Sequence, residues 1–302
     1  MGKLARRGYN CRVRSLRIAC LITALCCLSN GGGPGAAPLL DSRRMPPCLV
    51  QSAFGKSLPA SFHTPGPGEA LDWRVLEDYG AMFVVRGAEA PPVVIFPTAD
   101  SVARWQASVR SQEVEFDGIP VKLQSAAMQS LVKAREEAIH ARLNISARGA
   151  DAAQRDYDGT FRLWQSRLNP GLQHWVGKGL LSAADAGRIR RLPVRQQAAA
   201  ILGLESRGLH FSKDFSKSIL YSVAIPGASQ HLALLAFDVK EHDNPAVRSI
   251  LERHGWFQTV RSDLPHFTYL GVSANELPSL GLKLVREGGR AFWIPNLDCP
   301  RN

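Results

Sequence analysis

Four side chains in the C-terminal third of the chain could build a metal-dependent hydrolase: His231, Asp238, Asp263 and His266. A catalytic zinc ion takes three protein ligands from histidine, aspartate, glutamate or cysteine and keeps a fourth position for water. A further carboxylate beside that water can act as a general base. The segment from His231 to His266 therefore contains the full set of side chains for such a site.

The spacing of these residues sets a condition on the backbone. His231 and Asp238 are seven residues apart, so an extended segment would separate their Cα atoms by ~23 Å, too far for one ion. The segment must therefore bend, and the turn-rich sequence at 226–230 can supply a turn just before His231. The alternative is a buried histidine satisfied by hydrogen bonds, with aspartates that cap turns.

Composition and charge narrow the class of protein. Of the 302 residues, 45% are apolar and 21% are charged, which is typical of globular proteins. The formal net charge of +11 would suit a nucleic-acid-binding protein, but residues 1–44 hold eight Lys and Arg residues against one acid and so carry +7 of it. The rest of the chain is only mildly basic, which argues against a nucleic-acid partner.

The first 37 residues have the composition of a secretion signal. A basic segment precedes the apolar run Ile18–Leu28, and small and turn residues follow it. The run is too short for a membrane span of ~20 residues. We therefore expect residues 1–37 to be a signal peptide, with an uncleaved anchor as the alternative, and the mature chain to be periplasmic or extracellular without a membrane span. In an oxidising compartment Cys48 and Cys299 could form a disulfide, although two free thiols are the alternative.

Residues 38–124 divide into two predicted parts. Pro, Gly and Ser are frequent up to Gly68, so residues 38–69 are expected to be a linker or arm. Residues 70–124 are expected to form an N-terminal α/β extension. Its elements would be strands at 81–85 and 93–96, a helix capped by Thr98 or Asp100, and a hairpin around Asp117-Gly118.

Residues 125–298 alternate between helical and strand-like patterns. Helices are predicted at 125–142, from about 146 to 168 and at 246–254, and a helical insertion at about 169–215 contains helices at 180–191 and 195–204. Strands are predicted at 143–145, 220–225, 234–239, 257–260 and 266–270. This order favours an α+β domain with a small, mainly antiparallel sheet and flanking helices that hold the zinc site.

The site segment also carries a resemblance to a known family. PGASQH, then six residues and Asp238, followed by HGW and DLPHFTYLG, resembles the zinc D-alanyl-D-alanine carboxypeptidases of the VanY-like family and the related L-alanyl-D-glutamate endopeptidases. Upstream, LVKAREEAIHARLNISARGADAAQ is similar to that family's helix, strand and arginine segment. The likeness covers Leu131–Gly271, with a long insertion between its two halves.

The resemblance implies a role for each matched residue. Three residues would be the ligands of Zn²⁺: His231, Asp238 and His266. Asp263 would be the general base that deprotonates the attacking water, and Arg148 would bind a carbonyl or carboxylate of the substrate. Gln154 and Ser229 would also belong to the substrate site, Ser229 by orienting the loop around the first ligand.

Three positions depart from the family's pattern. The usual glycine after the first ligand is Leu234, so the local backbone or the floor of the pocket should differ. The arginine motif lacks its tyrosine and second serine, which leaves Arg207 as an alternative to Arg148. Asp263 stands where many of these carboxypeptidases have glutamate, and an aspartate there is closer to the endopeptidases.

Two classes of function fit these features. The first is an exported, monomeric zinc peptidase that hydrolyses D-Ala-D-Ala or related bonds in peptidoglycan stem peptides, with an L-Ala-D-Glu-type endopeptidase of the same family as the nearest alternative. The second is a non-catalytic cell-wall-binding protein on the same scaffold, which would fit Leu234 and the altered arginine motif.

Overall fold

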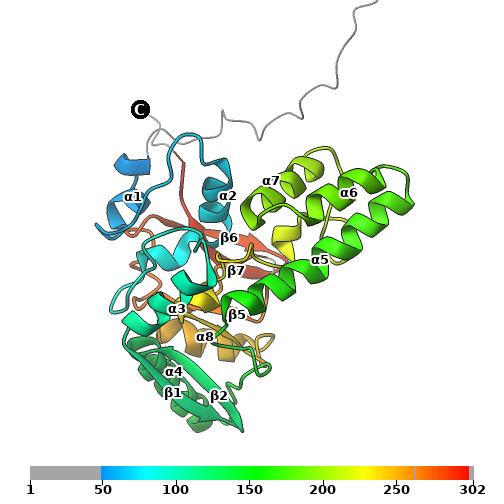
Figure 1. Cartoon of the computed structure of the whole chain (residues 1–302). Helices are drawn as coiled ribbons and strands as arrows, with labels where there is room; N and C mark the ends of the chain where they lie inside the picture. Colours follow the sequence, from blue (N-terminus) through cyan, green and yellow to red (C-terminus); the bar gives the residue numbers. More distant parts are fainter. Residues whose placement is uncertain (1–48, 262, 299–302) are drawn as a thin grey trace, which may run out of the picture. The chain divides into compact units, whose positions relative to one another are not determined.

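Helices and short antiparallel sheets make up the part of the chain that this computed structural model describes, residues 49–261 and 263–298 (Figure 1). The strands form two hairpins and one three-stranded sheet. The α+β class with small antiparallel sheets is therefore confirmed, although the strands are divided among three sheets. The expected signal peptide at residues 1–37, and Cys48 and Cys299 of the expected disulfide, lie outside the described residues.

The three-stranded sheet is buried throughout. Its strands are β3 (Ala236–Asp238), β4 (Trp256–Phe257) and β5 (His266–Tyr269), in the order β3-β5-β4. Both pairs are antiparallel, and every residue in these strands is buried. On the other side of β3, Ala147 forms an isolated antiparallel bridge with Val239. β3 and the residue that follows it are therefore held along both edges, by β5 on one side and by Ala147 on the other.

Two helices cover this region and begin where local signals predicted. α8 (Pro245–Arg253) joins β3 to β4 and packs against α4 (Ser125–His140). The side chain of Asn244 accepts a hydrogen bond from the Ala246 amide, and a proline occupies the first helical position. Gly255, at φ 77°, follows the end of α8 as a left-handed stop. Both helix predictions are confirmed.

The hairpin and helix predicted in residues 98–124 are also confirmed. β1 (Ser111–Phe116) pairs with β2 (Ile119–Gln124) through Asp117 and Gly118, whose φ angles of 53° and 81° are both positive, as a type I′ turn requires. α3 (Ala99–Ser108) begins with a capping box in which Thr98 and Ser101 bond to each other's backbone amides.

Several predicted strands are wrong. Residues 81–85 form the 3-10 helix η3 (Gly80–Val84), and residues 220–225 overlap the 3-10 helix η4 (Ile219–Tyr221). Residues 93–96 and 143–145 belong to no strand. The run at 81–85 is entirely buried, and a short buried apolar run has no periodicity that separates a strand from a helical turn.

Residues 49–69 differ from the linker expected there. They contain η2 (Leu49–Gln51) and α1 (Ala53–Ser57), and Phe54 is fully buried. Gly281, at φ 76°, lies so close that a Cβ atom on it would be 2.0 Å from the Phe54 amide nitrogen. This stretch is therefore packed against the C-terminal part of the fold.

A C-terminal hairpin was not predicted. β6 (Leu282–Glu287) and β7 (Arg290–Pro295) pair through Gly288 and Gly289, both with positive φ. A Gly-Gly pair between two such runs is a hairpin signal that could have located them. β7 contacts α2 (Ala70–Tyr79), so the hairpin packs against the N-terminal extension.

The two helices predicted within residues 169–215 are present as α6 (Ala183–Arg190) and α7 (Val194–Glu205). They follow α5 (Tyr157–Gly177), which begins at the Asp156 cap and not near residue 146. The indole nitrogen of Trp164 on α5 donates to the Gln197 side chain on α7 at 2.7 Å, and Figure 1 shows the three helices grouped together. Within the described residues, the helices are all too short or too polar to cross a membrane.

Alanine substitutions at two glycines in these helices should change the free energy of unfolding in opposite directions. A Cβ atom on Gly171 of α5 would be 2.3 Å from the Phe211 ring, whereas one on Gly203 of α7 would meet nothing within 4 Å. We expect Gly171→Ala to destabilise the fold by about 1–3 kcal/mol through overpacking. Gly203→Ala should stabilise it by up to about 1 kcal/mol, because alanine is the better helix former. Urea unfolding of both variants measures the difference, and two shifts of the same sign would contradict it.

Candidate metal centre

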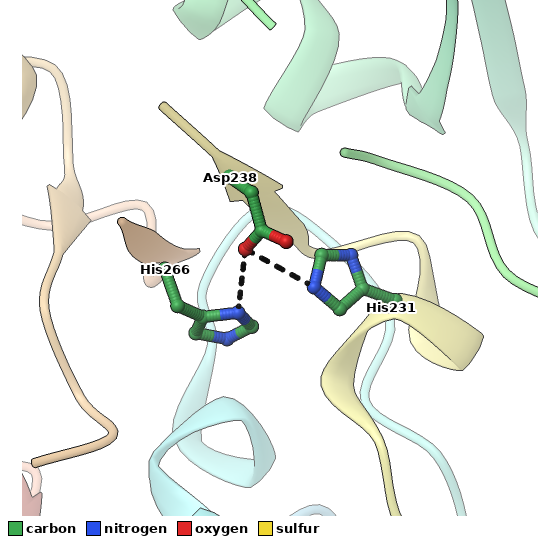
Figure 2. A group of neighbouring side chains, drawn as sticks. All are labelled: His231, Asp238 and His266. Carbon is green, nitrogen blue, oxygen red and sulfur yellow. Dashed lines mark hydrogen bonds and ion pairs between the residues drawn. The ribbon is translucent and has the colours of Figure 1, made fainter. Parts of the chain in front are cut away.

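Three short elements bring His231, Asp238 and His266 together (Figure 2). His231 lies in the 3-10 helix η5 (Gln230–Ala233), Asp238 ends β3 and His266 begins β5. The β3–β5 register places Asp238 directly opposite His266. The bend that the spacing demanded occurs between η5 and β3, so His231 turns back toward the end of the strand.

The backbone of this bend depends on Gly227 and Leu234. Gly227 has φ 91°, and a Cβ atom on it would lie 2.2 Å from the Phe96 carbonyl oxygen. Leu234 is fully buried in the left-handed region at φ 57° and ψ 33°, where a side chain costs about 1–2 kcal/mol. Glycine adopts this conformation freely. The leucine therefore keeps a backbone conformation that suits the glycine expected from the resemblance, and it does so with strain.

The three side chains have the spacing of metal ligands. Asp238 Oδ1 lies 3.3 Å from His231 Nε2 and 3.1 Å from His266 Nδ1. Atoms that are each about 2.0–2.2 Å from a tetrahedral ion are roughly 3.3 Å from one another. All three residues are buried, with exposed fractions of 1%, 8% and 4% in chain order. The group could therefore hold a metal ion with little adjustment.

Hydrogen bonds determine which nitrogen of each imidazole is available. His231 Nδ1 lies 2.7 Å from the Ala153 carbonyl oxygen, an acceptor, so Nδ1 carries the proton and Nε2 keeps its lone pair. His266 Nε2 lies 2.8 Å from Gln230 Oε1 and donates to it. The Gln230 amide cannot flip without loss, because its nitrogen donates to the Tyr79 carbonyl at 2.9 Å. The lone pairs of His231 Nε2 and His266 Nδ1 therefore both face Asp238.

Three electron-rich atoms meet at the centre of this arrangement. Burial lowers the pKa of His231 below its ordinary value, although Asp238 opposes the shift. Burial acts to raise the pKa of Asp238, but protonated His231 and His266, which would donate to the carboxylate, outweigh it and hold that pKa well below the ordinary range. His231 Nε2 is buried without a hydrogen-bond partner among the described residues. A cation between the carboxylate and the two lone pairs would satisfy all three atoms.

Two residues that the sequence reasoning did not select support the ligands. Arg155 donates from Nη2 to Asp238 Oδ2 at 2.8 Å, which leaves Oδ1 facing the histidines. Gln230 accepts from His266 and from the Thr268 hydroxyl. Gln230 directly precedes the first ligand and Arg155 directly follows Gln154, but neither position has a pattern that predicts these contacts.

The His231, Asp238 and His266 group lines a cavity of about 570 Å³, and other predicted site residues line the same cavity. Asp263 is half-buried in the loop before β5 and lines the cavity. Arg148 is exposed and Ser229 is buried, and both line it as well. The structure thus brings the expected base, the expected arginine and Ser229 to the cavity that contains the ligands.

Two other residues lie elsewhere. Gln154, expected to contact substrate, is exposed, is not among the lining residues and donates to the Gln106 side chain at 3.0 Å. Arg207, the alternative to Arg148, is exposed and also outside the lining. The cavity thus favours Arg148 of the two arginines.

Comparison with known proteins gives no match: no protein-family model, no curated protein and no solved structure is similar to this chain. The case for a metal centre therefore depends on the geometry of His231, Asp238 and His266.

The first prediction concerns metal binding itself. The protein should bind one Zn²⁺ and gain about 2.7 kcal/mol of stability at a free-ion concentration a hundred times the Kd. His231→Ala and Asp238→Ala should each abolish both effects, whereas His140→Ala, an exposed histidine on α4, should change neither. Elemental analysis after gel filtration and thermal unfolding measure them. A wild-type protein that neither retains the ion nor gains stability would contradict the site.

The second prediction concerns Gln230. Gln230→Leu removes the acceptor that holds the His266 proton on Nε2, so Zn²⁺ affinity should fall by about 10–100-fold. Gln154→Leu, at an exposed position outside the cavity, is the matched control and should leave affinity unchanged. Competition with a chromogenic chelator measures both. Equal affinities in the two variants would show that the hydrogen bond does not orient the ligand.

Proposed function

We propose that this chain is a zinc-dependent peptidase that hydrolyses D-Ala-D-Ala or related bonds in peptidoglycan stem peptides. The observation that carries the proposal is the buried His231, Asp238 and His266 group, whose available lone pairs converge at a cavity that Asp263 also lines. Two imidazoles and one carboxylate are a ligand set typical of Zn²⁺. The resemblance of the sequence to zinc carboxypeptidases supports the substrate class.

Each residue around the cavity would have a separate role in hydrolysis. When bound, Zn²⁺ would supply a polarising charge for a carbonyl and lower the pKa of a water molecule. Asp263 would accept a proton from the attacking water and pass it to the leaving amine. Arg155 would keep the Asp238 carboxylate oriented through their 2.8 Å contact. Arg148 would bind a carboxylate or carbonyl of the substrate.

A second type of peptide bond is also a candidate substrate. Asp263 is an aspartate where many of the related carboxypeptidases have glutamate, which favours an endopeptidase that cuts L-Ala-D-Glu-type bonds. Both enzymes would use the same ligands and the same base. Mass spectrometry of the products from purified peptidoglycan separates them, because one releases D-alanine and the other releases longer fragments.

The proposal also covers the cellular compartment, the disulfide and the oligomeric state of the protein. We propose that residues 1–37 direct export, that Cys48 and Cys299 are joined by a disulfide in the mature chain, and that the protein acts as a monomer. The basic and apolar pattern of the leader supports export. A periplasmic or extracellular protein would meet peptidoglycan directly.

The test separates metal binding from catalysis. Asp263→Asn should keep one bound Zn²⁺ and lose about 10²–10⁴-fold in the rate of stem-peptide cleavage, as expected for loss of a general base. Asp238→Asn should lose both, and Gln154→Ala should lose neither. Sacculus binding by the wild type without any released fragment would instead support a non-catalytic cell-wall-binding protein.

A further inference from the structure

Part of the cavity lining contains none of the three candidate metal-binding residues. This part, called the α5 wall below, comes from α5 and the segment after α7. Thr160, Leu163 and Arg167 line it at spacings of three and four residues, so they share one face of α5. Lys213 and residues 221–224 complete this wall. Most of it belongs to the helical insertion and the segment that follows it.

Two cations on this wall have no acidic partner within the described part of the chain. Arg155 pairs with Asp238 and Asp151, but Arg167 and Lys213 have no carboxylate within ion-pair distance among residues 49–261 and 263–298. Arg167 donates from Nη1 to the Ser166 hydroxyl at 2.9 Å, while its Nε is buried without a hydrogen-bond partner in the same residues. A buried N–H of a charged group without an acceptor is costly. The guanidinium group therefore keeps donors on its terminal nitrogens that a ligand carboxylate could use.

The segment that carries Lys213 is fastened to α5. His174 of α5 stacks on Phe215 with ring centroids 4.2 Å apart, and the Trp175 indole donates to the His210 carbonyl at 2.9 Å. The Lys213 amide donates to the Ser222 hydroxyl at 3.1 Å, on the same wall. These contacts hold the backbone at Lys213 in a defined position relative to Arg167, which lowers the entropic cost of binding one ligand with both.

The charges that line the cavity favour an anionic ligand. The cations are Arg148, Arg155, Arg167 and Lys213, and the carboxylates are Asp151, Asp238 and Asp263. A divalent ion at Asp238 would make the cavity more positive still. A cavity of about 570 Å³ is large enough for a short peptide to contact both the candidate ligands and the lining from α5 and Lys213.

We propose that Arg167 and Lys213, which line the same cavity as the candidate ligands, form a subsite for a carboxylate of a peptide ligand. The subsite rests on the proposed function for its role in peptide cleavage, but its binding of carboxylates does not require the metal. The carboxylate could be the C-terminus of the peptide or an acidic side chain within it. Either would accept hydrogen bonds from the guanidinium and the ammonium group.

Four peptides distinguish these sources. The first is acetyl-Ala-Glu-Ala-Ala, the second its C-terminal amide, the third its Glu-to-Gln form, and the fourth carries both changes. Calorimetry measures their affinity for the full-length protein with Zn²⁺ and after chelation. The fully charged peptide should bind about tenfold or more tightly than the peptide with both changes, with or without Zn²⁺. Whichever single change removes this difference identifies the carboxylate.

Matched variants assign the effect to the two cations. Arg167→Gln and Lys213→Gln should each weaken binding of the charged peptide roughly tenfold and leave the doubly neutral peptide unaffected, and Arg167→Lys should recover part of the loss. Arg162→Gln and Lys178→Gln remove exposed charges on or next to α5 outside the cavity, so they should have no effect. Circular dichroism checks that Arg167→Gln is folded. Lys213 is exposed, so its substitution should not change the stability of the fold.

The outcomes separate this subsite from the proposed peptidase. Charge-dependent binding that survives in metal-free protein, or in a protein that never cleaves peptidoglycan, supports the subsite alone. Equal binding of the four peptides by the wild type, including no binding of any, overturns it. Equal losses in the Arg167 and Arg162 variants would also overturn it, because the effect would then come from net charge.

Discussion

The pairing of β3 with β5 is the constraint on which the site depends. It places Asp238 opposite His266, and the loop at residues 146–153 binds the other edge of the same strand. The Asp238 amide donates to the Ala152 carbonyl at 2.8 Å, and the Arg148 amide donates to the Asp238 carbonyl at 2.9 Å. One three-residue strand therefore fixes a ligand, the loop that carries Arg148, and the Ala153 carbonyl that orients His231.

The same hydrogen bonds give the site its chemical character. A histidine whose proton is held by a carbonyl or an amide oxygen presents a lone pair on its other nitrogen. Here both imidazoles are held in this way, and both present their lone pairs to a buried carboxylate that accepts a hydrogen bond from Arg155. The protein has thus desolvated three electron-rich atoms beside one another, an arrangement that a bound cation would stabilise.

Local signals predicted a good part of the fold and the ligand set, but not the residues that support the ligands. Asn244-Pro245, Thr98 and Asp117-Gly118 each act within a few residues, so their helices and turn were predictable. The convergence of His231 with Asp238 required only a bend, which the spacing itself demanded. Arg155 and Gln230 could not be found in this way, since their partners lie 83 and 36 residues away in sequence and meet them only after folding. The apolar run at 81–85 predicts a strand but forms a 3-10 helix, because burial without periodicity leaves the backbone conformation undetermined.

Residues before 125 form hydrogen bonds that hold the backbone around the candidate ligands. Gln124 donates from its side chain to the Ala233 carbonyl at 2.9 Å and accepts at its own Oε1 from the Glu89 amide, and its backbone amide donates to the Leu234 carbonyl. Tyr79, at the end of α2, supplies the carbonyl that orients Gln230. A shortened gene product that began at residue 125 would contain every ligand and still lack the groups that hold the turn before β3. Residues 70–124 therefore support the His231, Asp238 and His266 group, and a chain that keeps this support must begin before α2.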